Sequence, residues 1–114
     1  MDKFYDVLLK KRYLSQNSQL VILPQDKVKQ FLDLLGNDWI INANGRLFKE
    51  YKFANFLEAI NFANKIALIA EEEQHHPDLY ISWGSCSVEI WTHTRNGLTE
   101  NDFLLAYKIT QLIQ

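Results

Sequence analysis

The stretch WIINANGRLFKEYKFANFLEAINFANKIALIAEEE, residues 39–73, predicts two strands followed by the longest helix of the chain. Residues 39–41 predict a short strand, and residues 47–53 alternate apolar and polar side chains as a second strand. Asn44-Gly45 between them is a favoured pair for a tight turn with positive φ. From about Asn55 to Glu73 the apolar residues form a wide helical stripe, which suits a helix that covers a sheet.

The residues before this stretch predict another helix. It begins near Pro24, because proline suits a first helical position, where its missing N–H needs no partner. Apolar side chains then recur at helical spacing until Gly36, which supplies the stop.

The residues after the long helix predict two further strands and a last helix. Residues 79–83 and 88–92 alternate as strands, with a turn at Gly84-Ser85 between them. The last helix begins at Thr99, because Thr99-x-x-Asp102 reads as a capping box with Asp in place of the usual Glu. This order, α-β-β-α-β-β-α, predicts an α+β fold: a four-stranded antiparallel sheet with helices packed on one face.

The chain length of 114 residues fits one domain, since two separate cores would each be small. We assign residues 24–114 to this domain and residues 1–23 to an N-terminal extension with no clear pattern.

Composition excludes several classes of protein. Twelve basic and fourteen acidic residues give a net charge of −2, without the basic surplus that is typical of nucleic-acid binding. The longest purely apolar run, Leu20 to Leu23, is far too short to span a bilayer. The single Cys86 excludes an internal disulfide and a multi-cysteine zinc site. We therefore expect a cytoplasmic protein that binds neither nucleic acid nor membrane.

All three histidines lie within residues 75–93, beside the run Glu71-Glu72-Glu73 at the end of the long helix. Three carboxylates there oppose the helix dipole, and such unfavourable local choices tend to mark functional sites. The dipole and the carboxylates favour protonated imidazoles, whereas desolvation favours neutral ones. Both effects move an imidazole across neutral pH, as a general acid–base catalyst requires.

Two other interpretations of the histidines remain open on these residues. Three imidazoles and a glutamate would be enough ligands for zinc or non-haem iron, although adjacent histidines rarely converge on one ion. A helix that ends in His75-His76-Pro77 also fits a purely structural end, in which the side chains cap the last carbonyls.

The spacing of these residues resembles the signature of the pterin-4a-carbinolamine dehydratases. Glu71-x3-His75-His76-Pro77 is similar to its opening, and the remaining elements follow at the family's intervals as Trp83, His93 and Asp102. Gly97-Leu98-Thr99 and Asn101-Asp102-Phe103 are similar to its closing segment. The resemblance extends more loosely over about residues 25–114, through Trp39 and Phe53-x-x-Phe56.

The resemblance implies an enzyme, 4a-hydroxytetrahydrobiopterin dehydratase, a hydro-lyase. The implied reaction converts pterin-4a-carbinolamine to quinonoid dihydropterin and water, which recycles the tetrahydrobiopterin cofactor of aromatic amino acid hydroxylases. It also implies a metal-free site with no cofactor of its own, a homodimer or homotetramer, and a functional link to phenylalanine hydroxylase. Relatives also act as dimerisation partners of transcription regulators, so a coactivator with little dehydratase role is the alternative.

The resemblance also assigns roles to residues. His75 and His93 are the expected acid–base pair, with His76 as a second acid or a positioning donor. The residues expected to bind or orient the pterin are Glu71, Gln74, Trp91, Thr92, Thr94 and Asp102. Gln74 departs from the pattern, because the family often has an acidic residue just before the two histidines.

Overall fold

The computed structural model describes residues 21–113. Their elements are α2 (Gln25–Leu35), β1 (Ile40–Ile41), β2 (Leu47–Lys52), α3 (Phe56–Glu73), β3 (Asp78–Ser82), β4 (Ser85–Ile90) and α4 (Glu100–Thr110). The predicted α+β fold and its order α-β-β-α-β-β-α are therefore confirmed over the described range. Most of the predicted extension, residues 1–20, lies outside the described residues.

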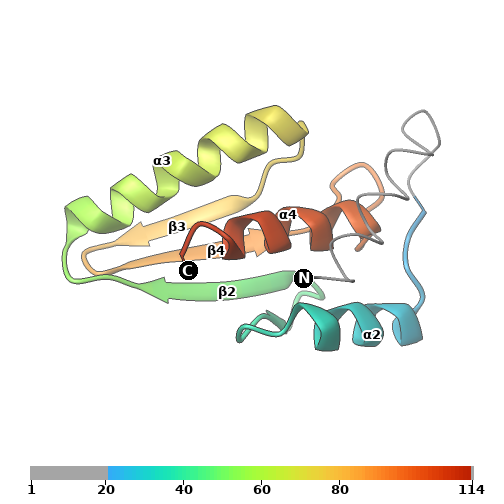
Figure 1. Cartoon of the computed structure of the whole chain (residues 1–114). Coiled ribbons are helices and arrows are strands. Elements are labelled where there is room, and N and C mark those ends of the chain that lie inside the picture. The colour runs from blue at the N-terminus through green and yellow to red at the C-terminus, as the bar shows by residue number, and fades with distance from the viewer. Residues whose placement is uncertain (1–20, 114) are drawn as a thin grey trace.

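The four strands form one antiparallel sheet in the order β1-β2-β4-β3. Asp78 pairs with Glu89 and Leu47 pairs with Ile90, so the start of β3, the end of β4 and the start of β2 are neighbours. Consequently the α3–β3 and β4–α4 connections and the β1–β2 turn lie at one end of the sheet (Figure 1). This end carries the predicted site residues.

The core lies between the sheet and the helices. Leu47, Val88 and Ile90 alternate toward this side, and each is fully buried. Ile66 of α3 and Phe103 of α4 are also fully buried against them. Asn55 begins α3 as its N-cap, because its side chain accepts a hydrogen bond of 2.9 Å from the Glu58 N–H. Within residues 21–113, no helix is long and apolar enough to cross a membrane.

Both predicted turns differ from the structure in detail. Ser82 pairs with Ser85, so the β3–β4 turn consists of Trp83 and Gly84, and the predicted turn at Gly84-Ser85 is wrong by one residue. At Gly84 a Cβ would lie 3.1 Å from the Phe53 carbonyl oxygen, which explains the glycine. In the β1–β2 turn, Gly45 has a φ of 76° and Asn44 does not take a positive φ.

Candidate active site

A residue with a left-handed backbone conformation ends α3, and the chain continues from it to β3. Gln74 has φ 52° and ψ 41°, and its N–H is within hydrogen-bonding reach of the Ala70 and Glu71 carbonyls. The His75 N–H then donates to the Ala70 carbonyl oxygen at 3.2 Å. The helix end is therefore capped by backbone groups, and the side chain of His75 is left for another contact.

Asp102, in the first turn of α4, is a fully buried carboxylate with several donors. Its Oδ2 accepts from the Thr99 N–H and from the Thr92 hydroxyl, each at 2.8 Å. The hydroxyls of Thr92 and Thr99 lie 2.9 Å apart. The predicted capping box is thus present, and the donors offset the cost of burying the carboxylate.

The other oxygen of Asp102 contacts the first histidine. Oδ1 lies 2.5 Å from His75 Nε2, and the His75 side chain is only 13% exposed. An ionised carboxylate accepts hydrogen bonds only, so Nε2 carries the hydrogen and Nδ1 is the second ring nitrogen available for proton transfer.

His76 and Glu71 form a second pair, on the surface. His76 Nε2 lies 2.5 Å from Glu71 Oε2, but the two side chains are 59% and 78% exposed. Solvent screens such a pair strongly, so it orients His76 only weakly.

His93 lies in a short loop between β4 and α4. The Thr92 N–H donates to the Gly97 carbonyl oxygen at 2.8 Å, which closes this loop. The exposed His93 ring stacks on Trp91, with ring centres 4.0 Å apart and an angle of 13° between the planes. Trp91 and His93 thus share one side of the chain, while Thr92 between them is buried toward Asp102.

The structure therefore places the predicted residues in three contact groups at one end of the sheet. His75, Thr92 and Asp102 form the buried group, Glu71 and His76 form the surface pair, and Trp91 and His93 form the stack. Gln74 and Thr94 are both exposed, at the end of α3 and in the 92–97 loop. Convergence of the three imidazoles on one substrate stays a prediction.

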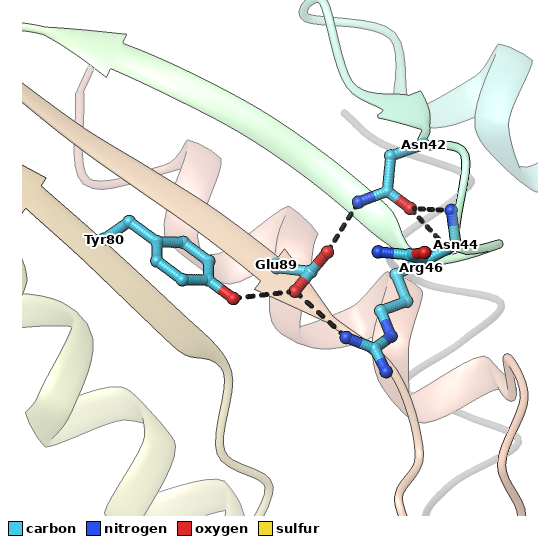
Figure 2. A network of polar contacts seen from close by, with 5 residues as sticks. All are labelled: Asn42, Asn44, Arg46, Tyr80 and Glu89. Atoms are coloured by element: carbon cyan, nitrogen blue, oxygen red, sulfur yellow. Dashed lines mark hydrogen bonds and ion pairs between the residues drawn. The ribbon is translucent and has the colours of Figure 1, made fainter.

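Sequence reasoning missed a polar cluster beside the stack, formed by Asn42, Arg46, Tyr80 and Glu89 (Figure 2). The Arg46 guanidinium carbon lies 3.5 Å from the ring centre of Trp91. The only sequence signal was the alternation of Glu89, Trp91 and His93 along one side of the strand.

A hollow of about 330 Å³ lies elsewhere, between α2 and the β1–β2 turn. Its apolar lining comes from Leu23, Val28, Leu32, Ile41 and Leu98, and none of the predicted site residues lines it. Within residues 21–113, no group of three or more His, Cys, Asp or Glu side chains is arranged to hold a metal ion.

Residues 22–112 match the sequence profile described as Pterin 4 alpha carbinolamine dehydratase. A Rickettsia canadensis protein, provisionally named pterin-4-alpha-carbinolamine dehydratase, is 52% identical over 94% of this chain and 98% of its own length. A Rickettsia bellii protein with the same provisional name is 57% identical over 79% of this chain and 80% of its own length. The crystal structure titled transcriptional coactivator/pterin dehydratase from Brucella melitensis has a TM-score of 0.76 and 27% identity, covering 82% of this chain and 100% of that one.

Proposed function

The chain belongs to the pterin 4 alpha carbinolamine dehydratase family, and from this premise we propose that it dehydrates 4a-hydroxytetrahydrobiopterin to quinonoid dihydropterin. The observation that carries the proposal is the contact of 2.5 Å between His75 and the buried Asp102. It supplies an oriented imidazole, and a positioned proton donor is what expulsion of a hydroxyl group needs.

The reaction sets two tasks for proton transfer. The C4a–O bond breaks with its electron pair on oxygen, and the oxygen must gain a proton to leave as water. The lone pair of the neighbouring ring nitrogen forms the new C=N double bond, and this nitrogen then loses its own proton to a base. Each positioned transfer contributes about 10²–10⁴-fold to the rate.

We assign the first task to His75. With Nε2 held by Asp102, Nδ1 presents a proton to the leaving oxygen. The Thr99 N–H of the helix cap and the Thr92 hydroxyl hold Asp102 in turn, so the His75 ring has little freedom to rotate.

His93 is the proposed base for the ring nitrogen. It is exposed and stacked on Trp91, so it remains accessible to a ligand and is still restricted in orientation. His76, which Glu71 orients only weakly, is proposed as a second acid or a positioning donor.

Backbone groups around residues 74–76 and 91–94 are proposed to match the edge of the pterin. The Thr92 hydroxyl donates to Asp102, so we assign Thr92 to the pterin through its backbone and to Asp102 through its side chain. The side chain of Thr94 is exposed and available to the substrate.

In the cell the proposed product returns to the tetrahydrobiopterin cycle of an aromatic amino acid hydroxylase, with phenylalanine hydroxylase as the proposed functional partner. We further propose that the protein acts in the cytoplasm, and that it is a homodimer or homotetramer, as the family resemblance implies.

The test is stopped-flow spectroscopy of chemically generated 4a-carbinolamine, with and without the protein. We expect faster decay and the absorbance of quinonoid dihydropterin as the product. Replacement of both His75 and His93 by Ala is expected to return the decay to the uncatalysed rate while the circular dichroism spectrum is unchanged. Decay that is equal with and without the wild-type protein would refute the proposed enzyme.

A second function is favoured by the name of the Brucella melitensis structure, which includes transcriptional coactivator. Under this alternative the protein is a dimerisation partner of a transcription regulator. Exposed apolar side chains on α3, such as Leu57 at 66% and Leu68 at 75%, offer a contact surface for it. A stable complex with a purified regulator that is unaffected by the histidine substitutions would favour this role over the enzyme.

A further inference from the structure

We infer that Arg46 is a positioning residue for His93, acting through Trp91 and held in place by Glu89. The inference rests on the proposed function in one respect, the role of His93 as a base. The contacts themselves come from four segments: the β1–β2 turn, β3, β4 and the loop that follows β4. Figure 2 shows those between the β1–β2 turn, β3 and β4.

Glu89 is the anchor of this arrangement. It lies on the sheet side opposite Val88 and Ile90, yet it is only 5% exposed. Its carboxylate accepts hydrogen bonds from Asn42 Nδ2 at 2.6 Å, from the Tyr80 hydroxyl at 3.1 Å and from Arg46 at 3.2 Å. A carboxylate with three donors, two from the β1–β2 turn and one from β3, has one defined position.

The charge state of Glu89 supports the same conclusion. Burial raises its pKa, but the hydrogen bonds from Asn42, Tyr80 and Arg46 and the Arg46 charge outweigh burial and leave the pKa below its ordinary value. Glu89 is therefore ionised at neutral pH and forms an ion pair with Arg46.

Arg46 is set at the end of the turn by the same asparagine. Asn42 Oδ1 accepts from the Arg46 N–H and the Asn44 N–H, each at 3.0 Å, while Asn42 Nδ2 donates to Glu89. The main chain of Arg46 is thus held by Asn42, and its guanidinium is held by Glu89.

From this position Arg46 fixes Trp91, and Trp91 fixes His93. The guanidinium carbon is 3.5 Å from the Trp91 ring centre, a distance at which a planar cation stacks favourably on an indole. The nearly parallel His93 ring, at 4.0 Å, then has one preferred plane although the loop around it is exposed. Since Glu89 already neutralises Arg46, a positioning role fits better than capture of an anionic ligand.

The direct test is proton NMR of the three histidine side chains, assigned with the single variants His75→Gln, His76→Gln and His93→Gln. The indole ring current is expected to shift the His93 ring signals upfield. In Arg46→Ala this shift should fall by at least about half, because Trp91 loses the contact that holds it. Arg95→Ala, which removes the same charge from an exposed position in the 92–97 loop, is the matched control and should leave the shift unchanged.

Kinetics provide the second readout. Arg46→Ala should lower kcat roughly tenfold with little change in KM, since it displaces a reacting group without removing it. In the His93→Gln background the same substitution should have no further effect on kcat, whereas a merely structural residue would lower kcat in both backgrounds.

Unchanged His93 signals in Arg46→Ala, or an equal loss of kcat in both backgrounds, would overturn the inference. The NMR result does not require any turnover. It therefore separates failure of this inference from failure of the proposed dehydratase, which appears as equal decay with and without the wild-type protein.

Discussion

Asp102 illustrates how one residue serves both the fold and the proposed chemistry. Its Oδ2 accepts from the first turn of α4 and from Thr92, while its Oδ1 contacts His75. A capping residue is fixed by backbone geometry, so the same geometry fixes the imidazole. The sequence motif includes both His75 and Asp102. It does not show that their side chains are in contact, because the two residues lie 27 positions apart in the chain.

Asp102→Asn should separate the two tasks. An amide has only one accepting oxygen, so it must present a donor either to His75 or to the donors at Thr92 and Thr99. We expect kcat to fall about 10²-fold and the free energy of unfolding to fall by about 1–2 kcal/mol. Stopped-flow kinetics and chemical denaturation measure the two effects.

Thr92→Ser is the matched control for this substitution, because it retains the hydroxyl that donates to Asp102. Its kcat should stay within about threefold of wild type, since the donor to Oδ2 is preserved. A wild-type kcat in Asp102→Asn would mean that the charge beside His75 plays no part in the reaction.

Among the elements, the end of α3 decides where the histidines lie. Gln74 takes a left-handed conformation, with φ 52°, for which glycine is the usual residue. Local signals predicted the helices and the capping box well, because caps and apolar spacing act within a few residues. The position of the β3–β4 turn was missed, since it depends on the pairing of Ser82 with Ser85 rather than on Gly84 alone.

Gln74→Gly should stabilise the fold, because glycine has no Cβ to strain at this φ. We expect a gain of about 0.5–1 kcal/mol in the free energy of unfolding, measured by urea denaturation. Gln74 is one of the residues expected to bind the pterin, and if its side chain contributes in addition to the backbone, KM should rise.

Gln74→Ala is the control, since it removes the same side chain and keeps the Cβ. It should raise KM as much as Gln74→Gly does, without the gain in stability. Lower stability of the glycine variant than of wild type would contradict this account of the α3 end.

For the molecule as a whole, the sheet brings together residues that no local pattern relates. Arg46 and Glu89 are 43 positions apart and meet only through the register of β2 on β4. Fold class was therefore predictable from periodicity and element order, whereas the cluster around Glu89 was not. The same reasoning applies to the exposed side chains of α3, whose partner the sequence pattern does not name.

Acid stability reports on the Glu89 cluster. Because folding lowers the pKa of this carboxyl, its contribution to stability is complete above its ordinary pKa of about 4.3 and is lost as the pH falls below that value. The free energy of unfolding should therefore decrease less steeply below about pH 4.3 in Glu89→Gln than in wild type. Glu50→Gln, at a position on the same side of the sheet, is the control. If the free energy of unfolding fell with pH at the same slope in wild type and both variants, the ionised Glu89 carboxylate would not stabilise the fold.

Oligomer formation is expected to involve α3. Leu68 is 75% exposed on this helix, a large apolar side chain that a partner subunit would cover. We expect a dimer or tetramer by light scattering, and a smaller species for Leu68→Glu. Leu34→Glu, at a position 56% exposed on α2, should leave the mass unchanged; a monomeric wild-type protein would contradict the proposal.

The central claim is that the buried His75–Asp102 pair donates the proton that expels the hydroxyl group. Its most direct test compares His75→Gln with His76→Gln by single-turnover decay of the carbinolamine under excess protein. We predict a loss of about 10²-fold or more for His75→Gln, and a clearly smaller loss for His76→Gln, whose carboxylate partner is 78% exposed. Wild-type decay in His75→Gln would contradict the claim.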